Sequence, residues 1–142
     1  MKKFIVTALF CTLGVSDVKI PMEANKIYII DFFASWCSSC EKEIPILSKL
    51  NERIKQKGIE LIAVDVDKRL EDGKAFQQKL SKHFTFKVIN DPTNEIISSY
   101  KPIGMPAIYV VKNNQICGKI FGAIPNLEEK LFEQIKLCEE KK

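Results

Sequence analysis

The sequence has no large excess of positive or negative charge, and it has neither the length nor the linkers of a multidomain chain. Its formal net charge is +4 over 142 residues, and cations and anions are scattered along it, which excludes the basic surface of a nucleic-acid-binding protein. No repeat, low-complexity tract or Pro/Gly/Ser-rich linker follows Pro21. We therefore expect residues 17–142 to fold as one domain with its own core.

A hydrophobic run long enough to cross a membrane is missing as well. The apolar segment 4–15 would cover about 18 Å as a helix, whereas a membrane core is about 30 Å thick. Two lysines, an apolar run and small residues up to Ser16 are the layout of a secretory signal, so residues 1–16 are predicted to be a cleaved signal peptide of a periplasmic protein. The alternatives are a retained membrane anchor, or a buried first strand of a cytoplasmic protein that begins near Phe4.

Two near-continuous apolar segments predict central strands. Residues 27–33 (IYIIDFF) and 60–66 (ELIAVDV) have the pattern of strands that are buried on both faces. The pattern between them is helical through about Lys57, where Gly58 ends the helix, and a charged helical stretch follows at 69–83. Because strands and helices alternate, we expect parallel pairing and an α/β fold class.

The second half of the chain predicts shorter elements. A short strand is expected at 84–89, followed by turn residues and a short helix at 95–100. Strands at 107–111 and 116–121 flank the four residues KNNQ and predict an antiparallel hairpin. A final helix carries its apolar residues on one face: Leu127, Leu131, Ile135 and Cys138.

Two cysteines three positions apart, Cys37 and Cys40, stand at the start of the first predicted helix. One helical turn brings their sulfurs together, and the free N–H groups and dipole of the helix N-terminus favour a thiolate. The spacing suits dithiol chemistry in which Cys37 attacks and Cys40 resolves the mixed disulfide. A structural disulfide or half of a zinc site has the same spacing. Zinc needs four ligands, however, and the remaining candidates of the expected domain show no paired ligand spacing: Cys117, Cys138 and His83.

The surroundings of this pair resemble the thioredoxin superfamily. The segment Asp31–Cys40 (DFFASWCSSC) resembles its active site, Pro45 its helix-kinking proline, and Gly104–Ala107 (GMPA) its cis-proline loop. The 66 positions from Cys40 to Pro106 leave room for an inserted helix and short strand, as in the TlpA/ResA-like thiol–disulfide oxidoreductases. The resemblance implies a thioredoxin fold: a central mixed sheet flanked by helices, with this insertion before the cis-proline. The N-terminal hairpin common in such relatives is shortened or missing.

The resemblance also implies a substrate-binding surface around the cysteines. Trp36, Met105 and Pro106 would contact the substrate, with Pro106 in the cis form and facing the pair. The alternatives are a trans proline in an ordinary turn and a tryptophan that serves only in packing.

Two acids near the pair are candidate catalytic residues. Asp31 lies in an otherwise apolar strand, where burial would raise its pKa and let it exchange a proton with Cys40. Thioredoxins commonly set a lysine near this acid on the next strand, where this chain has Ala63 and Val64. Glu43 matches a functional glutamate of the TlpA/ResA-type reductases. The alternatives are an Asp31 in water at the strand end and a Glu43 solvated in the first helical turn.

The resemblance implies a thiol–disulfide oxidoreductase whose redox-active disulfide, Cys37–Cys40, makes a bound cofactor or metal unnecessary. Because Asp31 and Glu43 disfavour a thiolate and no cation lies between the sulfurs, we expect a reductase. The expected partners are disulfides of exported proteins, among them apocytochrome c, and a membrane thiol electron donor, with the protein itself a monomer. The alternatives are a cytoplasmic general thioredoxin and a client-binding module without catalysis. Peroxiredoxins share the insertion, but their Thr-x-x-Cys pattern is absent.

The remaining cysteines of the expected domain are Cys117, on a predicted strand, and Cys138, on the buried face of the last helix. The simplest interpretation is that both are small buried hydrophobic residues. A disulfide between them is the alternative in an oxidising compartment, provided that the fold brings their Cα atoms close enough.

Overall fold

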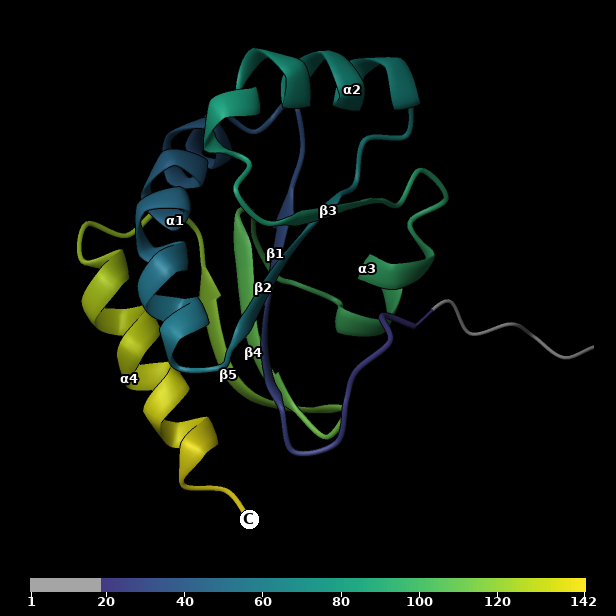
Figure 1. Cartoon of the computed structure of the whole chain (residues 1–142). Helices are drawn as coiled ribbons and strands as arrows, with labels where there is room; N and C mark the ends of the chain where they lie inside the picture. Colours follow the sequence, from purple (N-terminus) through teal and green to yellow (C-terminus); the bar gives the residue numbers. More distant parts are fainter. Residues whose placement is uncertain (1–18) are drawn as a thin grey trace, which may run out of the picture.

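The computed structural model describes residues 19–142, which are built around a five-stranded sheet (Figure 1). The strands are β1 (Ile27–Phe33), β2 (Glu60–Asp65), β3 (Lys87–Asn90), β4 (Ala107–Lys112) and β5 (Gln115–Phe121). The helices are α1 (Ser38–Gln56), α2 (Leu70–Lys79), the short 3₁₀ helix η1 (Ser81–His83), α3 (Glu95–Tyr100) and α4 (Leu127–Glu139). None of these helices is long and apolar enough to cross a membrane. The predicted signal peptide, 1–16, lies outside the described residues.

β1 occupies the centre of the sheet, whose strand order is β3-β2-β1-β4-β5. It pairs in parallel with β2 and antiparallel with β4, and all seven of its residues are buried. A strand that is covered on both faces and paired on both edges requires a nearly continuous apolar sequence, which explains IYIIDFF. The predicted mixed sheet is therefore confirmed. Residues 19–26, the described part of the chain before β1, contain no strand, in agreement with a shortened N-terminal hairpin.

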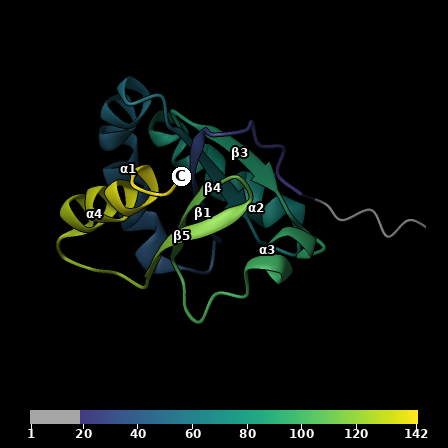
Figure 2. The same cartoon turned by 90° about the horizontal axis from the view of Figure 1, so that it is seen from below.

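Helices cover both faces of the sheet (Figure 2). α1 and α4 pack on one face, in a core cluster that includes Ile29 of β1. α3 covers the other face, where Ile96 belongs to the same cluster as Phe32. Since successive residues of a strand point to opposite faces, Asp31 of β1 lies on the α1 side, between Ile29 and Phe33.

The predicted insertion before the cis-proline is present as α2, η1 and β3. Its boundaries differ from the sequence prediction. The helix expected at 69–83 is divided into α2 and η1, and the strand expected at 84–89 begins only at Lys87. The first residues of that segment leave the ladder because the ring of Phe84 packs on the ring of Phe33, with centroids 5.4 Å apart. Aromatic packing thus replaces strand pairing at this point.

A two-residue turn joins β4 and β5. The sequence predicted a four-residue connection, but β4 continues through Lys112 and β5 begins at Gln115. Asn113 and Asn114 have φ angles of 53° and 59°. Two successive residues of positive φ are typical of the tight hairpin turn whose twist matches the strands, and asparagine tolerates this conformation better than most residues.

A disulfide between Cys117 and Cys138 joins β5 to α4. Their Cα atoms are 5.3 Å apart, within the usual range for a disulfide. The helix comes this close beside Gly118, where an added Cβ atom would lie 2.8 Å from the Cβ of Gln134. The expectation of two unpaired hydrophobic residues is therefore wrong. Its physical reason is the close approach of α4 to β5, which the spacing of the cysteines does not reveal.

We expect the double substitution Cys117→Ala/Cys138→Ala to lower the free energy of unfolding of the oxidised protein by about 3 kcal/mol, because a cross-link over 21 residues restricts the unfolded chain. Urea unfolding measures this difference. In the presence of a reductant, which opens the bond in the wild-type protein, the two proteins should become nearly equal. Equal stabilities under oxidising conditions would contradict the disulfide.

Candidate active site

The N-terminus of α1 lies just beyond the carboxyl end of β1 and carries the Cys37–Cys40 disulfide. Cys37 is the N-cap residue of α1, and its sulfur accepts a hydrogen bond of 3.2 Å from the backbone N–H of Cys40. After reduction, the same N–H group and the helix dipole favour a thiolate at Cys37. Cys37 is 7% exposed and Cys40 1%. Both residues are thus buried, and Cys37 is the more exposed of the two.

One helical turn after Cys40, the buried carboxyl groups of Glu43 and Asp31 interact with each other. Asp31 reaches this position from β1 and Glu43 from α1. Asp31 Oδ1 and Glu43 Oε1 are both buried, and neither has a hydrogen-bond partner within residues 19–142. The alternatives of an Asp31 in water and a solvated Glu43 are therefore wrong, because the first turn of α1 packs directly on the sheet.

Burial raises the pKa of both acids. The pKa of Asp31 lies well above 3.8, chiefly because the carboxylate would lose its hydration and also because of the charge and hydrogen bond of Glu43. Loss of hydration raises the pKa of Glu43 from 4.5 to about 7, against the lowering effect of the Asp31 hydrogen bond. Asp31 pairs in register with Ala63 on β2 and Ile108 on β4, so neither facing position supplies the lysine common in thioredoxins. The two acids titrate as a pair, and burial raises the pKa of each.

Trp36, Met105 and Pro106 are brought together with the cysteines, as predicted. The Met105–Pro106 peptide bond is cis, and Met105 packs on the core cluster that contains both cysteines. Ala107 pairs with Phe32, which sets Pro106 beside the end of β1 that leads to the cysteines. Trp36 is 67% exposed and, with Met105, lines a groove of about 370 Å³ that α3 borders. The tryptophan therefore does not serve in packing, and its ring is open to a partner.

Asp67 belongs to the site but was missed in the sequence. Its carboxylate accepts hydrogen bonds from the backbone N–H and the hydroxyl of Ser35, at 2.8 and 2.7 Å. Ser35 directly precedes Trp36 and Cys37, so this contact reaches the reactive turn. One signal could have pointed to it. The carboxyl ends of parallel strands meet at one edge of a sheet, and Asp67 follows β2 as Ser35 follows β1.

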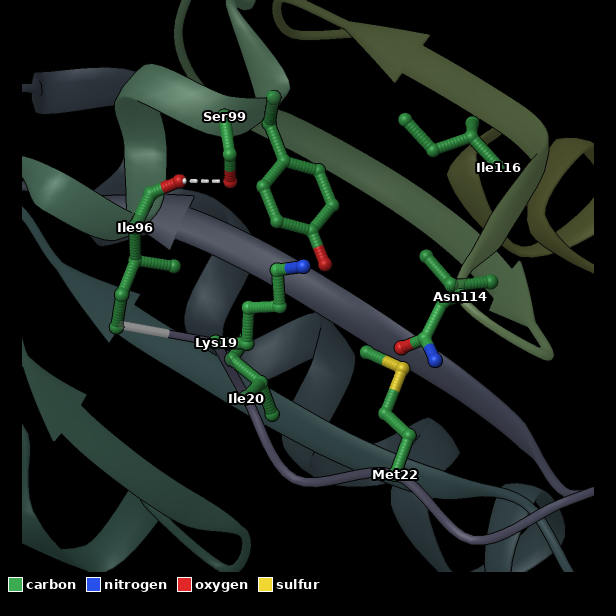
Figure 3. A pocket seen from close by; sticks show the side chains of 9 residues that line it. Lys19, Ile20, Met22, Ile96, Ser99, Asn114 and Ile116 are labelled. Atoms are coloured by element: carbon green, nitrogen blue, oxygen red, sulfur yellow. Dashed lines mark hydrogen bonds between the residues drawn. The ribbon is translucent and has the colours of Figure 1, made fainter. Parts of the chain in front are cut away.

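A second cavity, of about 190 Å³, lies on the α3 face of the sheet (Figure 3). Its walls come from the segment before β1, from α3 and from the β4–β5 hairpin, including Ile20, Ile96 and Asn114. None of the described residues that line it is a cysteine, and α1 is on the opposite face. This cavity is thus separate from the redox site. Within residues 19–142, no three potential ligands from His, Cys, Asp or Glu cluster as a metal site would require.

We expect the oxidised protein to lose stability as the pH rises from about 5 to about 8. The unfolded chain releases the Glu43 proton near pH 4.5, whereas the folded protein holds it until about pH 7, so the folded state binds more protons in this window. For Glu43 the effect amounts to about 3 kcal/mol. Asp65, whose pKa burial raises to about 6, acts in the same direction.

Thermal unfolding across this pH range measures the effect. The control variant Glu43→Gln, which cannot ionise, should show a flatter profile than the wild-type protein. A wild-type melting temperature that stays level or rises through the window would contradict the burial of the carboxyl pair.

Comparisons with known proteins agree with this geometry. The sequence model of the AhpC/TSA family matches residues 4–119. The thiol-disulfide oxidoreductase ResA of Bacillus thuringiensis subsp. konkukian is 32% identical over 113 residues, which are 79% of this chain and 63% of the relative. The ResA of Geobacillus kaustophilus is 27% identical over 116 residues, 79% of this chain and 64% of the relative. The chain therefore spans less than two thirds of the length of these curated relatives.

Solved structures show the same architecture. A protein from Chlorobium tepidum, described as a thiol:disulfide interchange protein DsbE, has a TM-score of 0.73 at 26% identity and covers 82% of each chain. The thioredoxin domain of a thiol-disulfide oxidoreductase from Bacteroides vulgatus has a TM-score of 0.63 at 26% identity, covering 79% of this chain and 78% of its own. The thioredoxin fold and the resemblance to ResA-like proteins are confirmed. Because the family match extends over most of the sequence, the chain belongs to the AhpC/TSA family of thioredoxin-like proteins.

Proposed function

We propose that the protein is a thiol–disulfide oxidoreductase that works by dithiol–disulfide exchange at Cys37 and Cys40. The observation that carries this proposal is a disulfide at a helix N-terminus, beside a groove lined by the exposed Trp36 and by Met105. The names of the similar proteins, ResA and DsbE, support the same chemistry. No bound cofactor is required, because the cysteine pair itself carries the two electrons.

The exchange runs in two steps in the reducing direction. The Cys37 thiolate attacks one sulfur of a client disulfide, and the other client sulfur leaves as a thiolate that takes up a proton. Cys40 then gives up its proton and attacks the Cys37 sulfur of the mixed disulfide, which releases the second client thiol. Two electrons have passed to the client, and Cys37 and Cys40 are joined in the form that the structure describes.

Asp31 and Glu43 are assigned to proton exchange with Cys40. Cys40 is buried, so its proton has to pass to a group inside the protein during the second step. Glu43 lies one turn along the same helix, and its carboxyl group interacts with that of Asp31. A pKa of about 7 at Glu43 suits a group that accepts and returns a proton near neutral pH.

The same acids favour a reductase over an oxidase. A strong dithiol oxidant stabilises the thiolate of its reduced form with positive charge or hydrogen-bond donors. Here the ionisable groups buried beside the pair are Asp31 and Glu43, and once Glu43 ionises, at about pH 7, its charge makes a negative charge on a nearby sulfur unfavourable. The reduced form is then less stable relative to the disulfide, and the pair tends to give its electrons away.

The proposed place of work is outside the cytoplasm. The layout of residues 1–16 is that of a secretory signal, and the Cys117–Cys138 disulfide suits an oxidising compartment, the periplasm in our proposal. The clients would then be disulfides of exported proteins, with apocytochrome c as the narrower candidate. A membrane thiol donor would return electrons to the pair, and the protein would act as a monomer.

Reduction of insulin disulfides by dithiothreitol tests the proposed activity. The wild-type protein should accelerate the reaction, and Cys37→Ser should abolish the acceleration because the attacking sulfur is gone. The double variant Cys117→Ala/Cys138→Ala is the matched control and should remain active. A wild-type protein that is inert, or a Cys37→Ser variant that is as active as wild type, would leave the fold as a client-binding module only.

The Cys40→Ala variant, expressed in cells, identifies the client protein. It should complete the first step and stall, because no second thiol remains to resolve the mixed disulfide on Cys37. Non-reducing electrophoresis of the periplasmic fraction followed by mass spectrometry detects the adduct. Recovery of the protein from the cytoplasm with residues 1–16 intact would favour the general thioredoxin alternative.

The redox potential tests the direction. We expect the Cys37–Cys40 couple to lie closer to the thioredoxin value of about −270 mV than to the value of a strong oxidase, about −120 mV. Titration in thiol buffers should be done on the Cys117→Ala/Cys138→Ala protein, so that the measured potential belongs to the Cys37–Cys40 couple alone.

A second measurement concerns Glu43. At about pH 8, where Glu43 is ionised, Glu43→Gln should make the potential less negative. A wild-type potential near that of strong oxidases would contradict the reductase assignment.

A further inference from the structure

A buried carboxylate holds the turn that precedes Cys37. Asp67 is 6% exposed, and its two oxygens accept hydrogen bonds from two donors of one residue, the N–H and the hydroxyl of Ser35. The two residues are 32 positions apart in the chain. A two-point contact of one carboxyl group with a single residue fixes both the position and the orientation of that residue.

Ser35 lies at the middle of a tight turn. The backbone N–H of Cys37 donates to the carbonyl of Ala34 at 3.1 Å, so residues 34–37 form one turn between β1 and α1. Trp36, the other central residue, is largely exposed and adds little anchoring. Of the two central residues of the turn, Ser35 is therefore the one that is tied to another part of the protein by hydrogen bonds.

Asp67 is itself held by the end of β2 and by α2. Its backbone N–H donates to Asp65 Oδ1 at 2.9 Å, and Gln77 of α2 donates to Asp65 Oδ2 at 2.7 Å. The first turns of α2 pack directly on the carboxylate of Asp65, since a Cβ atom at Gly73 would lie 2.5 Å from Asp65 Oδ2. The contacts from α2 through Asp65 and Asp67 to Ser35 form a continuous network, in which the two acids are buried and Ser35 and Gln77 are half-buried.

We propose that Asp67 is a positioning residue for Cys37. By holding Ser35 at two atoms, it keeps the turn in the form in which the Cys37 sulfur faces the N–H of Cys40 and Trp36 borders the groove. Asp67 acts through Ser35, not on the reacting sulfurs. The proposal rests on the thiol–disulfide function proposed above and adds a determinant of its rate.

Asp91 offers a matched control. It is also a buried acid, 3% exposed, that follows a parallel strand and accepts two hydrogen bonds. Its donors are the N–H groups of Ile96 and Ile97 in the first turn of α3, at 3.2 and 3.0 Å. Its loss removes a similar number of buried contacts without touching the turn before Cys37.

The first test compares insulin reduction by the variants Asp67→Ala, Ser35→Ala, their double mutant and Asp91→Ala. We expect Asp67→Ala to lower kcat/KM about tenfold and Ser35→Ala about threefold, because a displaced nucleophile reacts more slowly. The double mutant should have a kcat/KM no lower than that of Asp67→Ala, since both changes remove the same contact.

Two further variants serve as controls. Asp91→Ala should lower the melting temperature but leave kcat/KM within about twofold of wild type. Asp67→Asn, whose amide can still accept from the N–H of Ser35 and donate to its hydroxyl, should restore most of the rate.

The second test needs no client protein. In the Cys40→Ala background, which retains the backbone N–H at position 40, the pH dependence of Cys37 alkylation by iodoacetamide reports the thiol pKa, read by mass spectrometry at the Cys37 peptide. Ser35→Ala should move the midpoint to higher pH, because a loosened turn weakens the hydrogen bond from that N–H to the thiolate. Asp91→Ala should leave the midpoint unchanged.

Two results would overturn the proposal. One is an Asp67→Ala protein whose kcat/KM matches that of Asp91→Ala together with an unshifted midpoint in Ser35→Ala, which would make the contact purely structural. The other is a double mutant in which the two losses multiply, which would show that Asp67 and Ser35 act independently. If instead insulin reduction survives Cys37→Ser, the proposed function fails, while the alkylation midpoint still measures the hold of Asp67 on the turn.

Discussion

β1 is buried along its whole length between two hydrogen-bonded neighbours, and the redox site depends on this placement. Its carboxyl end runs into the turn and the N-terminus of α1, which carry both cysteines. Its antiparallel partner β4 begins opposite Phe32, directly after the cis-proline. Its parallel partner β2 ends beside it and leads to Asp67, which holds Ser35. Three separate segments therefore converge because they share one strand as a neighbour.

The same burial sets the chemistry of the pair. A helix that packs its first turn on the sheet has to bury the residue one turn after Cys40, and in this chain that residue is Glu43. It meets Asp31 of β1, so two acids share a region where water is excluded, and the residues that face Asp31 on β2 and β4 are the uncharged Ala63 and Ile108. The cost of a charge there favours the protonated forms and sets both the pH dependence of stability and the reducing tendency that we propose.

The two disulfides serve different parts of the sheet. Cys37–Cys40 lies at the carboxyl end of β1, next to a groove and an exposed tryptophan. Cys117–Cys138 ties β5 to α4, and Cys138 is fully buried. The segment of β4 opposite Cys117 pairs with the first half of β1, away from the redox turn. A cross-link at that place stabilises the last helix without taking part in the exchange.

Local pattern was enough to predict the strands at β1 and β2, the hairpin and the last helix, because each depends on residues that are close in the chain. The redox interpretation of Cys37 and Cys40 needed the resemblance to thioredoxins, which includes the distant Pro106. The two-residue turn, the start of β3 and the division of the second helix were misplaced, since the packing of Phe84 on Phe33 and the positive φ values of two asparagines are properties of the folded molecule. The approach of the cis-proline loop to the cysteines came from the resemblance, whereas other contacts between distant segments were not predicted. The Cys117–Cys138 bond, the burial of Glu43 against Asp31 and the hold of Asp67 on Ser35 each require two elements to approach within a few ångströms. That approach is decided by how the helices pack on the sheet. The spacing of two residues along the chain does not determine their distance in the folded protein.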